Sequence, residues 1–167
     1  MSAKLSKIER IILINQFKIL NKLEPESFYE QHIEALEGGF TNFYDEIYQD
    51  LNDEVPNDTL DFTNNVLEMY RAMTVFANKS DDQELKSLVV FNGFDQTGEF
   101  DYWNYTDFLI CKLGRYPELR ANKGNDDFSS HSSIISKYKR QFKVWEKHGK
   151  PIFENITKEI ALEIIES

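Results

Sequence analysis

Apolar residues recur along most of the chain at the three- and four-residue spacing of amphipathic helices. The first such segment follows Ser6 and Glu9, which have the spacing of a helix capping box, and Pro25 ends it. Its apolar residues point almost all round the helix, so we expect it to lie in the middle of a bundle. These residues are Ile8, Ile11, Ile12, Leu13, Ile14, Phe17, Ile19, Leu20 and Leu23.

The same periodicity predicts further helices, bounded by residues that cap or break helices. Gly38 and Gly39 end the second helix, Gly114 ends the sixth and Thr157 can cap the last. Residues 115–132 are polar and patternless, so we expect a long loop there. Alternating strand patterns are nearly absent. The sequence predicts an all-α fold, a single domain over residues 1–167 with seven or eight helices and no linker. The later helices are predicted at about 26–37, 41–51, 57–77, 83–89, before Gly114, at 133–148 and 157–165.

The segment GFDQTGEFDYWNY, residues 93–105, combines glycines, carboxylates and aromatic rings. A calcium-binding EF-hand loop with Gly98 at its sixth position would have Gly93 first and Asn104 last, so two ligands are missing. A helix start fits better than a ligand loop, because Asp95 or Thr97 can accept the free N–H groups of a first turn.

Composition narrows the functional classes. The chain has 167 residues, a net charge of -10 and a pI near 4.8, which disfavours binding to nucleic acid and to anionic lipid. No apolar run reaches transmembrane length, and Cys111 is the single cysteine, so we expect a cytoplasmic protein. Residues 24–70 contain no Lys or Arg, whereas residues 112–150 carry a basic excess. Opposite charges of this kind, together with many aromatic residues, favour a homo-oligomer, with a dimer preferred.

Candidate chemistry is sparse. The three histidines form no metal-binding pattern, and we expect no metal and no cofactor. Asn15 and Gln16 have apolar helical neighbours, so at least one amide is expected to be buried, with Glu68 as its candidate partner. Either these amides fix the helix register, or they line a polar pocket for a small ligand. The predicted ligand-binding residues are Asn15, Gln16, Glu68, Tyr70, Asp95, Arg115 and Tyr116.

Several segments in order resemble the YfbU family, bacterial proteins without an assigned activity. They are ILINQFKIL near the start, LEMYRAM at 67–73, FNGFD at 91–95, GRY at 114–116 and KYKRQFKVW at 137–145. The resemblance implies a helical fold and a ligand-binding role, because family members can occur beside a helix-turn-helix. We therefore predict a binding or regulatory module with an unknown small ligand or protein partner. The alternative is an enzyme that uses Glu68, Asp95 or Glu99 as a general acid or base.

Overall fold

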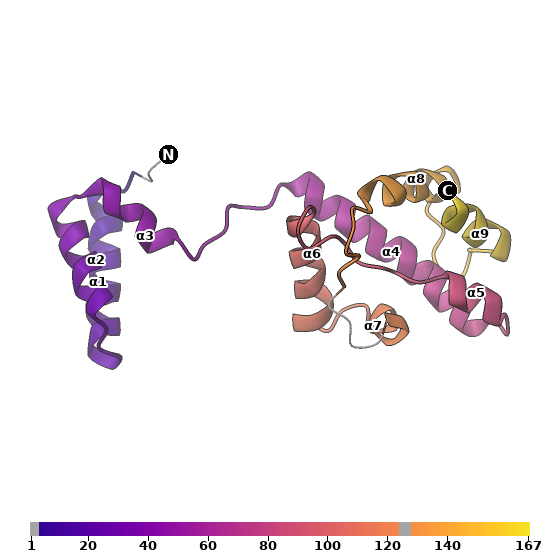
Figure 1. Ribbon diagram of the computed structural model, residues 1–167, viewed down its shortest axis with the longest axis horizontal. Coiled ribbons are helices and arrows are strands. Elements are labelled where there is room, and N and C mark those ends of the chain that lie inside the picture. The colour runs from indigo at the N-terminus through magenta and orange to yellow at the C-terminus, as the bar shows by residue number, and fades with distance from the viewer. Residues whose placement is uncertain (1–3, 124–127) are drawn as a thin grey trace. The chain divides into compact units, whose positions relative to one another are not determined.

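The structure, a computed structural model, describes residues 4–123 and 128–167 (Figure 1). It confirms the all-α prediction: the described residues hold nine α-helices, seven of which have seven or more residues. Within these residues, strand-like pairing is limited to one isolated bridge between Phe94 and Ser129. We predicted one domain, and the chain divides into two compact units, residues 1–54 and 55–167. Each unit is described by itself.

The N-terminal unit is a helical hairpin followed by a short helical segment. The predicted capping box is present: the Ser6 hydroxyl accepts the Glu9 N–H at 3.2 Å, and Glu9 Oε2 accepts the Ser6 N–H at 2.7 Å. Gly39 ends the second helix in a left-handed conformation with φ 70°. The elements are α1 (Lys7–Leu23), α2 (Ser27–Gly38), the 3-10 turn η1 (Thr41–Phe43) and α3 (Tyr44–Tyr48).

Within the N-terminal unit helix α1 is not surrounded by other helices, so the prediction that it lies in the middle of a bundle is wrong for this unit. It packs along α2 through Leu13, Ile14 and Phe17, which are half-buried, and none of its residues is buried. Asn15 and Gln16 are both exposed, so the prediction of a buried amide is also wrong. The physical reason is that the hairpin offers α1 one packing partner, which covers one side of the helix.

The C-terminal unit is organised around its longest helix, α4 (Asn57–Lys79), which packs against α5, α6, α7 and α8 (Figure 1). Helix α9 packs against α8 and α5. The remaining elements are α5 (Gln83–Leu88), α6 (Phe100–Asp107), the π-helical turn η2 (Phe108–Lys112), α7 (Pro117–Lys123), α8 (Ile135–Lys147) and α9 (Lys158–Glu166).

Aromatic rings form the centre of the C-terminal core. The ring centres of Phe91 and Tyr138 are 5.8 Å apart and stacked, and those of Tyr70 and Tyr138 are 5.5 Å apart. The hydroxyls of the two buried tyrosines are satisfied: Tyr138 donates to the Gly93 carbonyl at 3.0 Å, and Tyr70 donates to Gln141 Oε1 at 2.9 Å. The two tyrosines therefore keep their hydrogen bonds inside an apolar core, whereas the hydroxyls of Thr74 and Thr106 are buried without a hydrogen-bond partner among the described residues.

Two local predictions need correction. The segment 93–105 does start a helix, α6, but no side chain caps it; Asp95 Oδ1 instead accepts the Thr97 N–H at 3.1 Å. The predicted loop 115–132 contains α7, which begins at Pro117 and buries Leu119. Proline is well suited to a first helical position, so this start had a readable signal. Residues 124–127 of the predicted loop lie outside the described residues.

Candidate functional site

A cavity of about 480 Å³ opens beside α4 in the C-terminal unit. One side of it is a face of α4 on which residues recur at helical spacing, from Glu68 to Val75. The other side comes from the end of α8 and the segment after it. Apolar and charged side chains thus share one cavity, and its lining residues are Glu68, Arg71, Ala72, Val75, Glu118, Trp145, Lys150, Ile152 and Phe153.

A charged network centred on Arg71 lies at this cavity. Its guanidinium lies 3.7 Å from Glu68 Oε1 through Nη1 and 3.2 Å from Glu118 Oε1 through Nε. The Tyr116 hydroxyl donates to Glu68 Oε1 at 2.9 Å, and Arg71 Cζ is 5.6 Å from the centre of the Tyr116 ring. Arg71 therefore has two anionic partners in the cavity wall, Glu68 and Glu118, and one aromatic partner, Tyr116, which does not line the cavity.

The Tyr116 side chain stays a hydrogen-bond donor. Burial raises its pKa to about 12, and the hydrogen bond to Glu68 and the charge of that carboxylate act in the same direction. The phenol is thus protonated at neutral pH and fixes the position of the Glu68 carboxylate.

The backbone at this site is unusual. Tyr116 has φ 52° and Lys150 has φ 53°, a region that residues with a side chain rarely occupy. Each such residue costs on the order of 1 kcal/mol, and they gather at functional sites more often than elsewhere. Lys150 also lies 3.4 Å from Glu146 Oε1, and its ammonium is 4.7 Å from the centre of the Phe142 ring.

The structure brings together two of the predicted site residues, Glu68 and Tyr116. Arg115 is exposed beside Tyr116. Tyr70 lies in the core, where burial raises its pKa and Gln141 accepts its hydroxyl. Asn15 and Gln16 belong to the N-terminal unit, whereas Glu68, their predicted partner, belongs to the C-terminal unit.

Sequence reasoning missed most of the cavity. Arg71 had a signal, since it follows Glu68 by three residues on one helix. Glu118 and the residues after α8 had none, because they come from distant parts of the chain.

Glu99 is a structural carboxylate that holds the start of α8. Its Oε1 accepts the Ser133 hydroxyl at 2.6 Å and the N–H groups of Ile134 and Ile135 at 2.8 and 3.0 Å. Its Oε2 accepts the Asp95 N–H at 3.1 Å. Burial by itself would raise the pKa of Glu99, but these hydrogen bonds outweigh it and the pKa is lowered. A carboxylate held ionised by four donors is poorly suited to act as a general acid.

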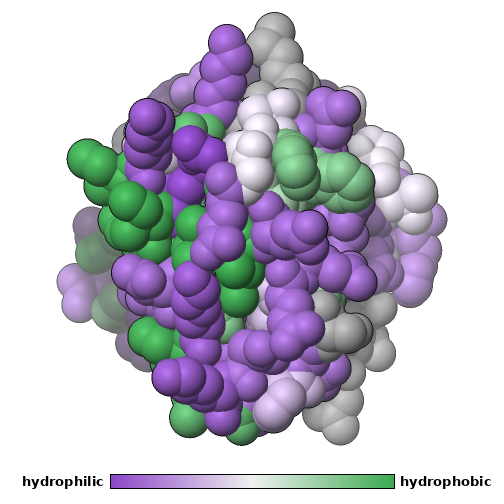
Figure 2. Space-filling model, turned by 90° about the vertical axis from the view of Figure 1, so that its left-hand side faces the viewer, coloured by the Kyte–Doolittle hydropathy of each residue, from purple (hydrophilic) through white to green (hydrophobic). Residues whose placement is uncertain are grey.

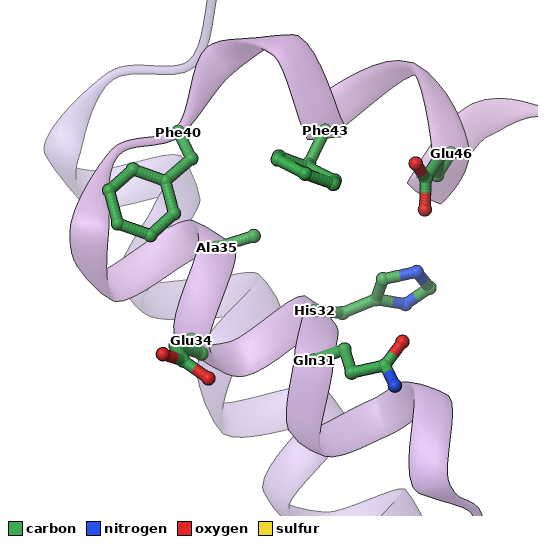
Figure 3. Close-up of a pocket in the computed structure, with 7 residues that line it drawn as sticks. All are labelled: Gln31, His32, Glu34, Ala35, Phe40, Phe43 and Glu46. Atoms are coloured by element: carbon green, nitrogen blue, oxygen red, sulfur yellow. The ribbon is translucent and has the colours of Figure 1, made fainter.

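A second cavity, of about 300 Å³, lies in the N-terminal unit between α2 and the segment of η1 and α3 (Figure 3). Figure 3 shows Phe40 and Phe43 on one side of it and His32 on the other. His32 Nδ1 is buried and has no hydrogen-bond partner among the described residues. The lining is Gln31, His32, Glu34, Ala35, Phe40, Phe43 and Glu46.

Two searches of the described residues, 4–123 and 128–167, gave negative results. Within that part of the chain, no group of three or more His, Cys, Asp or Glu residues is arranged to hold a metal ion. No helix there combines the length and the apolar character needed to cross a membrane.

Comparison with known proteins gives one consistent result. Residues 3–165 match the family described as the YfbU domain, so the match extends over both units. The UPF0304 protein MJECS11 of Methanocaldococcus jannaschii is 36% identical over 151 residues, which covers 85% of this chain and 88% of that protein. Both matches agree with the resemblance found in the sequence motifs, and the chain belongs to the YfbU family.

Proposed function

We propose that this protein is a binding module whose C-terminal unit holds a small zwitterionic molecule with an apolar body. The observation that carries the proposal is the cavity of about 480 Å³ in which the Arg71 network meets an apolar wall. Ligand sites in proteins are mostly apolar concavities in which a few placed polar groups set the orientation of the ligand.

The charges at the cavity favour a zwitterion over a simple anion or cation. Glu68 and Glu118 provide two carboxylates, and Arg71 and Lys150 provide two cations. A ligand with one charge of each sign can exchange partners with the existing ion pairs and leave none of these charges unpaired. Its apolar body would contact Val75 and Phe153.

Binding is favoured over catalysis by the state of the carboxylates. Glu99 is fully engaged by hydrogen-bond donors, Asp95 accepts a turn N–H, and Glu68 accepts the Tyr116 hydroxyl. Each of the three carboxylates that an enzyme would use already has a hydrogen-bond donor within the protein.

Calorimetric titration of the full chain with L-phenylalanine and L-leucine tests the proposal. We expect at least one of them to bind, and phenylacetate and phenethylamine, which each keep one charge, to bind at least about tenfold more weakly. If phenylacetate binds as tightly as L-phenylalanine, the ligand class is a simple anion and the proposal of a zwitterion is wrong. Failure of all four probes to bind would count against the cavity as a site for amino-acid-like ligands.

Variants locate the binding. Arg71→Ala removes the centre of the network, and Val75→Trp fills the apolar part of the cavity, so either should abolish binding. Arg140→Ala is the matched control, because Arg140 is an exposed arginine on α8 that does not line the cavity. Equal loss of binding in Arg71→Ala and Arg140→Ala would indicate a general charge effect and not this site.

A further inference from the structure

Helix α1 carries a stripe of exposed aliphatic side chains on the side away from α2. Ile8 and Leu23 are each 72% exposed, and Ile12 and Ile19 are each 53% exposed. At about 100° per residue these four side chains fall within about 60° of one another around the helix. Figure 2 shows several groups of apolar residues among the polar ones on the face of the molecule that it draws. We call Ile8, Ile12, Ile19 and Leu23 the α1 stripe.

Among residues 4–54, the described part of the N-terminal unit, no element covers the α1 stripe. In its described part the buried apolar residues are only Ala35, Leu36 and Tyr44. Contiguous apolar surface of this kind on a folded unit marks an interaction site. A two-helix hairpin also needs further packing to be stable in water, since most of the stability of a helix comes from burying its apolar face.

The α1 stripe is symmetric about the peptide bond between Asn15 and Gln16. Ile8 and Leu23 lie at equal distances along the helix from this bond, and so do Ile12 and Ile19. A two-fold dimer requires a surface that complements itself, so that residue i of one copy meets residue j of the other and j meets i. An antiparallel pair of α1 helices would place Ile8 opposite Leu23, and Ile12 opposite Ile19.

We propose that a second copy of this chain covers the α1 stripe, with the two α1 helices antiparallel about a two-fold axis beside Asn15 and Gln16. The pairing differs from one driven by the acidic and basic halves of the chain, because its centre is apolar. It is also independent of the cavity in the C-terminal unit.

The amides acquire a role in this arrangement. Asn15 lies within one residue of the axis, so it meets Asn15 of the second copy, and each amide can both donate and accept a hydrogen bond. A polar residue at the centre of an apolar helix interface fixes the register of the pair at some cost in stability. This explains why two amides interrupt an aliphatic helix and stand exposed in the single chain.

Sedimentation of the full chain tests the dimer. We expect a dimer at low micromolar concentration that persists in high salt, because the contact is apolar. Ile12→Glu combined with Ile19→Glu places carboxylates in the interface and should give a monomer. Leu23→Glu and Leu51→Glu form a matched pair, since both residues are 72% exposed in the N-terminal unit and Leu51 lies outside the α1 stripe. Leu23→Glu should weaken the dimer, and Leu51→Glu should leave it unchanged.

Disulfide formation tests the direction in a Cys111→Ser chain, which is otherwise free of cysteine. Asn15→Cys should cross-link to itself on oxidation. Ile8→Cys alone should not, because the two copies of residue 8 lie about 22 Å apart along the antiparallel pair. An equimolar mixture of Ile8→Cys and Leu23→Cys chains should cross-link.

Three results would overturn the proposal. One is a full chain that remains monomeric at all concentrations, whatever else covers the α1 stripe. Another is a dimer that survives Ile12→Glu with Ile19→Glu. The third is Ile8→Cys cross-linking to itself as fast as Asn15→Cys, which would show a parallel pair. The cysteine variants keep the test decisive if the glutamate variants fail to fold.

Discussion

Helices α1 and α4 are both rich in apolar residues, yet they differ in how many of these residues are buried. Helix α1 has no buried residue, whereas nine residues of α4 are buried. The difference comes from their neighbours: α1 packs along α2, and α4 packs against four other helices. An apolar pattern therefore predicts that a helix forms, while the number of elements around it decides how much of it is buried.

The two units differ in the same way in their polar groups. In the C-terminal unit Tyr70, Tyr138 and Glu99 are buried and fully hydrogen-bonded by residues of that unit. In the N-terminal unit the comparable contacts are exposed, as in the pair of Lys18 and Glu37, 2.9 Å apart. Exposed ion pairs contribute little stability. We infer that the C-terminal unit is stable by itself and that the N-terminal unit depends on what covers α1.

Separating the units gives the largest expected effect. Residues 55–167 expressed alone should keep their helical circular dichroism and unfold cooperatively, because they contain the aromatic core. Residues 1–54 alone should lose helical signal on dilution well below the micromolar range, because the α1 stripe then loses the second copy that covers it. A dilute, monomeric fragment 1–54 with full helicity would break the comparison.

Substitution of Gly93 by alanine adds a single carbon atom and tests how tightly the C-terminal core is packed at this position. Its φ is +81°, and an added Cβ would lie 1.7 Å from the Phe128 carbonyl oxygen. Gly93→Ala should therefore separate the bridge in which the Phe94 N–H donates to that oxygen at 3.0 Å. We expect a loss on the order of 4 kcal/mol in the free energy of unfolding.

The matched control is Gly114→Ala. Gly114 also has positive φ, +66°, but nothing lies within 4 Å of its added Cβ, so the cost should be about 1–2 kcal/mol from backbone strain alone. Urea unfolding followed by tryptophan fluorescence measures both, since Trp103 and Trp145 both belong to the C-terminal unit. Equal losses of unfolding free energy in the two variants would show that the close approach of residue 93 to the Phe128 carbonyl oxygen adds no cost to the backbone strain.

The helices could be predicted well from the sequence because the apolar period of a helix and the residues that start and end it are local features. The Ser6 capping box, the Gly114 end and the Thr157 cap all involve residues within a turn of each other. It failed where the outcome depends on distant residues. The pairing of Glu68 with Tyr116 spans 48 positions, and no local pattern encodes it.

The division into two units was also hidden from the sequence. The segment around residue 54 has neither a glycine-rich nor a low-complexity composition, so nothing marks it as a boundary. Burial of α1 was overestimated for the related reason that its apolar pattern was taken to imply apolar neighbours. Helix α7 was missed because it has little apolar periodicity, and among residues 117–121, whose burial is described, Leu119 is the one buried side chain.

Glu99 and Glu9 have similar roles at the start of a helix, one in each unit, so the effects of replacing them can be compared directly. Both carboxylates accept N–H groups at a helix start, but Glu9 is exposed on α1 and Glu99 is buried against α8. Glu99→Ala would leave the N–H groups of Ile134 and Ile135 without their acceptor, a loss on the order of 3 kcal/mol in unfolding free energy. Glu9→Ala should cost clearly less, because water replaces the lost acceptor. Similar losses in both variants would contradict the difference in burial.

Lowering the pH should show how much the ionised Glu99 carboxylate contributes to the stability of the C-terminal unit. Burial raises the pKa of Glu99, but the hydrogen bonds from Ser133 and the backbone outweigh this effect, so the folded-state pKa lies below its ordinary 4.5. A lowered folded-state pKa means that the carboxylate contributes its full stability above about pH 4.5 and loses it as the pH falls through the folded-state value. Glu99→Gln cannot titrate, so the stability gap between the unaltered chain and this variant should be constant near neutral pH and shrink in acid. Urea unfolding by tryptophan fluorescence from about pH 7 to about pH 3 measures that gap. A gap that stays constant over the whole range would show that the pKa of Glu99 is the same in the folded and the unfolded chain. The hydrogen bonds to Glu99 could not then be what distinguishes the C-terminal unit.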